Sequence, residues 1–461
     1  MSRRKQLKDK SNQEDHGSKN KGSSPNEALP VQTFDDYQCT GNVEVDFLML
    51  CGLLNMQEVP AVSTKHPASS TDVNEGVGED DLSQISVSTL WFKPCLNIEL
   101  ENEDPLSVMR MRISGWKVNE QIFRALQKML PSMNQLQCLQ FCQAGLTDPM
   151  IVSLTNTMSL CSNLRAVSLE GNPLPEQSFH LLLSEDSILT DLSLRNNQIG
   201  DEGARLIGSA LSTTKSANKN LLSLNLAFNN IRDAGAAHIA QGLRLNRTLV
   251  FLSLSNNQIG DSGAAHLAAI LGEFALTHEE VVERRKLLLQ KMQAADLEQT
   301  STSQVSPLHA PSRENKGTLR KKQKSARKDE KTAEIKEKSQ KKTLDGKGTQ
   351  SRSLKGGGRE KQLSALEDKS STNLNEAASV ETGNPLLDYS VHRKNGQLFL
   401  PGNMRLASLN LAGNRITKKS LPLFLASLEK QEDVGRNLRR LCLQRNLFLA
   451  DSKFYRKIEE I

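Results

Sequence analysis

The chain has 461 residues, of which 37% are hydrophobic and only 4% aromatic, so much of its length lies outside any compact core. Its formal net charge is +6. The longest apolar stretch, which starts at Phe47, is far too short to cross a bilayer, and the polar opening has no signal-peptide core. We therefore expect a soluble protein without a membrane partner.

The N-terminal third becomes more regular along its length. Residues 1–33 are polar and mixed in charge, which predicts a disordered arm. Residues 34–90 are poorly defined, with one short helix expected within 43–56. From Cys95 the residues alternate like a half-buried strand, and we assign 91–104 to a cap that covers the open end of the repeats described next.

One sequence pattern occurs three times between Leu189 and Leu271, with copies that start at Leu189, Leu221 and Leu249. In each copy the first, fourth and sixth positions are Leu, the ninth is Asn and the eleventh is Ile. Leucines two apart face one side of a short strand, and the Asn marks a turn. An Asp then precedes an Ala-rich run, which predicts a helix whose free N–H groups that Asp caps. These Asp residues are Asp201, Asp233 and Asp261.

This spacing resembles the leucine-rich repeats of the long, ribonuclease-inhibitor-like class. Weaker copies start at Val108, Leu136, Leu164, Leu406 and Leu438. Trp116 and Ala144 replace the Asn in two early copies, so their turns depart from the pattern. The resemblance implies an α/β horseshoe-shaped solenoid with parallel strands on the concave face and helices on the convex face. Residues 91–297 hold the cap, the first repeats and an exit helix.

The exit helix is expected to begin at a capping box formed by Thr277 and Glu280. Val281, Leu288, Met292 and Ala295 lie near one face of it. That face is expected to pack on the last repeat, or alternatively to dock a partner helix in a coiled coil.

Residues 298–383 predict a disordered basic insertion, because Lys316–Lys361 carries 17 Lys or Arg against 6 Asp or Glu. Residues 384–461 hold the C-terminal repeats and a terminal cap. Two repeats are too few to stand alone, so we expect them to dock on the earlier repeats. The longer connection costs only about 1.5 kcal/mol of closure entropy.

Catalytic and metal-binding patterns are missing from the sequence. The glycine clusters follow no strand, and there is neither a nucleophile elbow nor a His-Glu-x-x-His motif. His238 and His266 occupy equivalent places in adjacent repeats, but two His are too few for a structural zinc site. The seven cysteines, Cys138 and Cys142 included, are scattered and are expected to be reduced thiols. We expect neither an enzyme nor a cofactor.

The concave face is the expected place for function. Its central stripe is small and neutral, and an apolar cluster beside it is typical of a protein-binding hot spot. The predicted partner-binding residues are Leu222, Phe228, Val250, Phe251, Asn225, Ser253 and Arg195. Alternatively, the two phenylalanines pack on the insertion or on each other. The two ends of the face are basic, with Arg110 and Arg112 at one and Arg439, Arg440 and Arg445 at the other.

A second hypothesis has the basic insertion bind a polyanion, either nucleic acid or an acidic microtubule tail. Its candidate residues are Arg320, Lys321, Lys322, Lys324, Arg327 and Lys328. The stretch has no aromatic side chains for base stacking, which disfavours nucleic acid, and a solvated linker is the simpler interpretation. We expect a cytoplasmic protein, with cytoskeletal or ciliary attachment as a further hypothesis.

Overall fold

The computed structural model describes residues 33–66, 94–302, 384–432 and 438–460. They divide into two compact units, one within Met1–Leu182 and Ile188–Asn197, the other within Leu183–Ser187 and Gln198–Ile461. In both, short parallel strands alternate with helices, as a leucine-rich-repeat solenoid requires. Each of the eight predicted repeats contributes a strand, so the predicted fold is confirmed. The basic insertion, including the six Lys and Arg residues proposed for polyanion binding, lies almost wholly outside the described residues.

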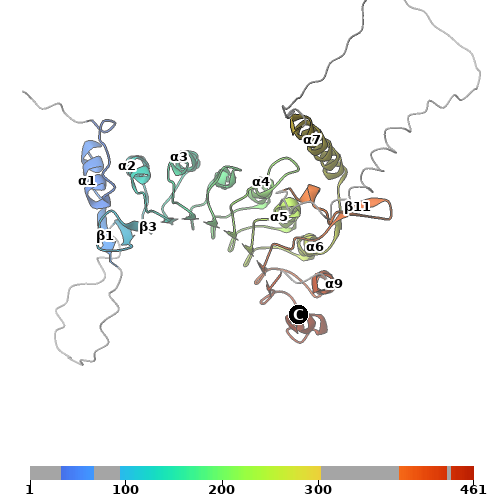
Figure 1. Cartoon of the computed structure of the whole chain (residues 1–461). Coiled ribbons are helices and arrows are strands. Elements are labelled where there is room, and N and C mark those ends of the chain that lie inside the picture. Colours follow the sequence, from blue (N-terminus) through green and yellow to red (C-terminus); the bar gives the residue numbers. More distant parts are fainter. Residues whose placement is uncertain (1–32, 67–93, 303–383, 433–437, 461) are drawn as a thin grey trace, which may run out of the picture. The chain divides into compact units, whose positions relative to one another are not determined.

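Within residues 33–66 and 94–197, the first unit holds six strands in sequence order, from β1 to β6 (Figure 1). Its elements are α1 Val43–Leu53, β1 Ala61–Lys65, β2 Cys95–Leu100, β3 Val108–Ser114, α2 Glu120–Met129, η2 Leu130–Ser132, β4 Cys138–Cys142, α3 Asp148–Met158, β5 Ala166–Ser168, η3 Ser178–Leu183 and β6 Asp191–Ser193.

Strand β2 covers the open end of the first repeat, because it pairs antiparallel with β3 and parallel with β1. Helix α1 lies beside α2 and extends this cap (Figure 1). The buried carboxylate of Asp46 orders the chain before it, since it accepts hydrogen bonds from the hydroxyl of Tyr37 and from the backbone of Thr40 and Gly41. Burial, followed by the contact with Asp46, raises the pKa of Tyr37 to about 12.

Trp116 replaces the Asn of the first repeat without disrupting the turn. Its indole Nε1 donates to the carbonyl oxygen of Cys95 at 3.0 Å, which ties the repeat to β2. The preceding Gly115 has φ +78°, a left-handed conformation that glycine adopts at little cost. At the next turn, the amide of Ala144 donates to the side chain of Asn172, which is the same cross-repeat hydrogen bond that the amide of Asn172 makes to Asn197.

The second unit contains four parallel strands in the order β7, β8, β12, β13. Helices α4, α5, α6 and α9 follow one another along the other side of these strands (Figure 1). The elements of this unit are α4 Asp201–Leu211, β7 Ser223–Asn225, α5 Asp233–Leu245, β8 Phe251–Ser253, α6 Asp261–Leu271, β9 Phe274–Ala275, α7 His278–Thr302, η4 Pro385–Leu387, β10 His392–Lys394, β11 Gln397–Leu400, β12 Ser408–Asn410, α9 Leu421–Glu432, β13 Arg440–Cys442 and α10 Lys453–Glu460.

Strand β12 pairs directly with β8, with Ser408 opposite Phe251 and Leu409 opposite Leu252. The C-terminal repeats therefore continue the second unit's stack, as the two-repeat argument predicts. Two polar bridges reinforce the junction. Asn414 donates to Leu254, and Asp261 accepts from Thr417 and Ser420.

The helix-initial Asp residues act differently from the prediction. None of the helices α4, α5 and α6 has a side-chain N-cap hydrogen bond, because each begins at the Asp itself. The carboxylate instead reaches the next repeat. Asp201 accepts from the amides of Arg232 and Gly235, and Asp233 accepts from those of Gly260 and Gly263. The prediction that each Asp caps its own helix was wrong, because each carboxylate accepts from amides at the start of the next repeat's helix.

A second series of asparagines went unrecognised in the sequence. Asn218, Asn246 and Asn403 each stand three residues before the first Leu of a repeat and are almost fully buried. Each side chain accepts from the amide of that Leu and donates to carbonyl oxygens of the preceding repeat. The constant spacing of three residues between this Asn and the first Leu of the repeat is the sequence pattern that could have identified them.

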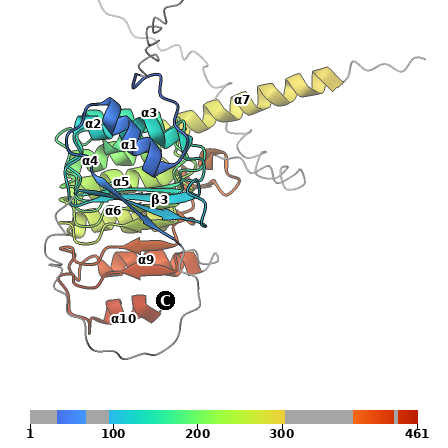
Figure 2. The same ribbon diagram turned by 90° about the vertical axis from the view of Figure 1, so that its left-hand side faces the viewer.

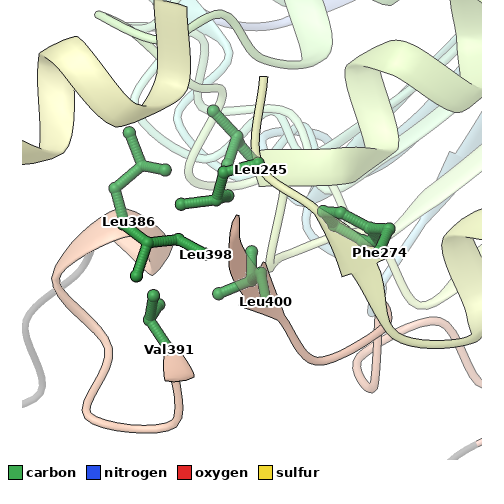
Figure 3. Packing of buried hydrophobic residues seen from close by; sticks show 7 residues of the cluster. Leu245, Phe274, Leu386, Val391, Leu398 and Leu400 are labelled. Atoms are coloured by element: carbon green, nitrogen blue, oxygen red, sulfur yellow. The ribbon is translucent and has the colours of Figure 1, made fainter. Parts of the chain in front are cut away.

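Helix α7 begins with the predicted capping box, because the Thr277 amide donates to Glu280 and the Glu280 amide donates to the Thr277 hydroxyl. The predicted face is covered only near its start, where Val281 and Leu288 are half-buried, whereas Met292 and Ala295 are exposed. Val281 and Leu287 pack on the segment 384–400, which returns to the second unit and pairs β11 with β9. Figure 3 shows Leu386, Val391, Leu398 and Leu400 of this segment gathered near Leu245 and Phe274.

The far part of α7 extends away from the stacked helices of its unit (Figure 2). Leu289 and Met292 are each 44% exposed there, so the predicted packing of Met292 on the last repeat is wrong. Among the described residues, no helix has the length and apolar character needed to span a bilayer.

Candidate functional site

The candidate site is the strand face of the second unit, which we define as the outward positions of β7, β8, β12 and β13. Side chains alternate along a strand, so in β7, β8 and β12 the middle leucine points inward and its two neighbours point outward, whereas in β13 Leu441 is half-buried and Cys442, at the second outward position, is buried. The registers align these outward residues in two rows. The first row is Ser223, Phe251, Ser408 and Arg440, and the second is Asn225, Ser253, Asn410 and Cys442.

A shallow hollow of about 200 Å³ lies on this face. All eight residues of the two rows line it, together with Leu224 and Leu252. Half of the outward residues precede the long interruption and half follow it. The hollow therefore exists only because β12 pairs with β8. The sequence indicated which residues line the hollow, since Ser408 and Arg440 occupy the same motif position as Phe251.

The predicted apolar cluster is exposed at three of its four members. Phe251 is 52% exposed, Phe228 45% and Leu222 40%, whereas Val250 is half-buried. The amides of Val250 and Phe251 both donate to the carbonyl oxygen of Leu222, at 2.8 and 2.9 Å, which holds these three residues side by side. Exposed aromatic and aliphatic side chains grouped in this way are typical of an interaction surface.

Phe228 occupies a backbone position that disfavours a large side chain. Its φ is +57°, and the equivalent residues of the other repeats in this unit are Asn256, Gly413 and Arg445, all with positive φ. Asn and Gly adopt this left-handed region readily, whereas a bulky side chain pays about 1 kcal/mol. The repeat carries an exposed phenylalanine at a turn where a polar residue or glycine would be more stable.

The predicted polar members have partly structural roles. The side chain of Asn225 accepts from the amide of Ala227 at 3.1 Å, which fixes its orientation at the end of β7. Ser253 lies in the hollow beside Ser255, with the two hydroxyl oxygens 3.4 Å apart. Arg195 belongs to the first unit, where its guanidinium lies 3.8 Å from the carboxylate of Glu170. The strand face as defined here therefore does not include Arg195.

One end of the strand face is basic. Arg439, Arg440 and Arg445 are exposed, and no described carboxylate lies within ion-pair distance of them. Nε of Arg440 donates to the sulfur of Cys442 at 3.3 Å, which orients the guanidinium along the strand. None of the eight outward positions is Asp or Glu. The face is thus apolar around Phe251 and positive two strands away.

No group of three or more metal-ligating side chains occurs among the described residues. His238 and His266 are exposed on α5 and α6. All seven cysteines are unpaired thiols. Burial raises the pKa of Cys51 and of Cys161 to about 11, which leaves both thiols protonated and unreactive near neutral pH.

The match to a known family agrees with the repeat architecture. A family model described as Leucine Rich repeat matches residues 187–208, 217–240 and 245–268. An internalin (inlF) from Listeria monocytogenes is 14% identical, with 79% of this chain and 70% of that one covered and a TM-score of 0.30. The actin-binding site 2 of leiomodin-1 is 18% identical, with 40% of this chain and 95% of that one covered and a TM-score of 0.21. At these TM-scores neither similarity transfers a partner or a function.

Proposed function

We propose that this chain, built from leucine-rich repeats, is a non-enzymatic scaffold that binds a protein partner on the strand face of its second unit. The observation that carries the proposal is Phe251, which is 52% exposed at the edge of a hollow lined by small polar residues. Aromatic anchors beside polar groups dominate the affinity of many protein interfaces. The exposed Phe228, held in a conformation unfavourable to it in the turn after β7, supports an interaction surface beside this face.

The test is affinity purification from native cells with quantitative mass spectrometry, comparing the wild type with a Phe251→Asp/Phe228→Asp double variant. A matched control is Leu423→Asp, because Leu423 is 46% exposed on helix α9. A partner that is lost with the double variant and kept with Leu423→Asp supports the proposal. If every interaction survives the double variant, the strand face is not the binding site.

A second candidate function is polyanion binding by Lys316–Lys361, where Lys and Arg exceed Asp and Glu by 11. Such binding depends on released counterions and therefore weakens steeply with salt. The test compares the full chain with a variant lacking these residues for co-sedimentation with microtubules and for binding to single-stranded RNA, each at low and high salt. Unchanged binding after the deletion rules this function out.

We further propose a cytoplasmic location, with cytoskeletal or ciliary attachment through the bound partner. Seven unpaired cysteines fit a reducing compartment. Protease protection of the tagged chain in selectively permeabilised cells tests this, since a chain in a secretory compartment would resist digestion when only the plasma membrane is opened.

A further inference from the structure

Phe251 and Arg440 stand in one row of the strand face, with Ser408 between them. Neighbouring strands of a sheet lie about 4.8 Å apart, so the two positions are separated by about 10 Å across β12. The backbone positions of an apolar side chain and of a guanidinium without an ion-pair partner among the described residues thus lie at a fixed spacing on either side of the hollow. The pairing of the strands holds both positions.

The charge of this face selects its partner. Three exposed arginines, Arg439, Arg440 and Arg445, stand at one end, and no acidic residue occupies the outward positions. A guanidinium binds a carboxylate with two parallel hydrogen bonds, which gives both affinity and direction. The chain's own segment Lys316–Lys361, with a charge excess of +11, would be repelled. The complementary ligand is an acidic segment of another protein.

The polar lining of the hollow favours an extended ligand. The hollow is shallow, with a volume of about 200 Å³, and an α-helix already pairs its own backbone groups, whereas an extended peptide leaves them free to pair with the lining. The lining between Phe251 and Arg440 consists of Ser253, Ser408 and Asn410, whose hydroxyl and amide groups can pair with the peptide groups of a ligand backbone.

A polyproline II segment fits this spacing. It has three residues per turn and rises about 3.1 Å per residue, so residues three apart face the same side about 9 Å from each other. We infer that the strand face recognises an extended acidic segment of a partner protein. In that segment a large apolar residue contacts Phe251, and an Asp or Glu three residues away, in either chain direction, binds Arg440. This inference rests on the proposed function and specifies its ligand.

The test uses the full-length protein and fluorescein-labelled proline-rich peptides, measured by fluorescence anisotropy. One peptide carries Leu and Glu three residues apart, and others carry Gln or Lys in place of Glu, a one-residue longer spacing, or a helical sequence with Leu and Glu seven residues apart, about 10 Å along one face of the helix. We expect the three-residue Glu peptide to bind at least tenfold more tightly than the others, and the preference to weaken with salt.

Charge exchange supplies the sharpest control. Arg440→Glu should weaken binding of the Glu peptide at least tenfold, and the Lys peptide should restore binding to this variant. Arg405→Glu is the matched control, because Arg405 is exposed just before its strand and outside the hollow. Equal binding of the Glu, Gln and Lys peptides, or preference for the helical peptide, would overturn the inference.

The two proposals fail separately. If native partners are lost with Phe251→Asp and unaffected by Arg440→Glu, the strand face binds a protein and the acidic motif is wrong. If native partners survive both variants, the proposed function itself is wrong. Far-ultraviolet circular dichroism of each variant confirms that the fold is retained, as expected for substitutions of exposed residues.

Discussion

Asn414 and Leu254 are 160 residues apart in the sequence, yet the Asn414 Nδ2 donates to the Leu254 carbonyl oxygen at 2.9 Å. The same side chain accepts from the amide of Ile259 at 3.1 Å and donates to Leu411 of its own repeat. Every other repeat junction in the second unit connects neighbouring stretches of sequence. At this one, the buried amide of Asn414 is one of the side chains that join the two sides of the interruption, together with Asp261 and Asn403.

Asn414→Ala should lower the free energy of unfolding by about 2–4 kcal/mol, since the amide of Ile259 and a carbonyl oxygen lose their partner in a buried place. Urea denaturation followed by circular dichroism measures the change. Asn230→Ala is the control, because Asn230 is exposed near the equivalent turn and should change stability by less than about 0.5 kcal/mol. Equal effects of the two substitutions would contradict the bridging role.

The carboxylate of Asp261 gives the same junction a dependence on pH. Burial opposes its ionisation, but hydrogen bonds from Ser420 and Thr417 outweigh that effect and hold its pKa below the ordinary value. A lowered folded pKa contributes stability above the unfolded value of about 3.9, and this contribution disappears as pH falls through the folded value. The stability difference between wild type and Asp261→Asn should be full at pH 7 and shrink below about pH 4.

Thermal denaturation of both proteins from pH 7 to pH 3 checks this expectation. The exposed Asp451→Asn reports the general effect of removing one negative charge. A difference that stayed constant over the whole range would show that the charge of Asp261 is not what stabilises the junction.

Two helical glycines should respond oppositely to alanine. A Cβ at Gly242 would lie 2.2 Å from the carbonyl oxygen of Gly208 on the neighbouring helix, so α4 and α5 must separate to admit it. A Cβ at Gly52 in α1 meets no atom within 4 Å. Gly242→Ala should cost about 1–3 kcal/mol by overpacking. Gly52→Ala should stabilise by up to about 1 kcal/mol, through the lower entropy of the unfolded chain.

Chemical denaturation of the two single variants decides the matter. Stabilisation by Gly242→Ala would mean that the close approach of α4 and α5 is not required by the fold.

The returning segment should be an integral part of the second unit. Leu400 is 1% exposed and lies opposite Phe274 in the three-stranded sheet of β9, β10 and β11. Leu400→Ala should therefore lower the free energy of unfolding by about 2–5 kcal/mol. The control Leu449→Ala removes a side chain that is 76% exposed. If both variants unfolded at the same urea concentration as wild type, the segment would not stabilise this unit.

Sequence alone determined the repeat, because its signals are local. Leucines two positions apart place their side chains on one face of a strand, and the Asn that follows marks the turn at which the strand ends. The position of Phe251 outside the core followed from the same alternation, whereas Phe228 is exposed because it lies in the turn with a positive φ. The capping box of α7 was equally local, since Thr277 and Glu280 are only three residues apart.

Only the tertiary structure decided which repeat follows which across the interruption, because pairing of β8 with β12 depends on complementary faces and not on sequence distance. Two other predictions were wrong for the same reason, because the contacts join parts of the chain that are far apart in sequence. Asp201 accepts from an amide of the next repeat, and α7 packs on the returning segment. The hollow beside Phe251 could not be predicted from the sequence for the same reason. Its walls come from strands far apart in the chain, and stacking of the repeats brings them together.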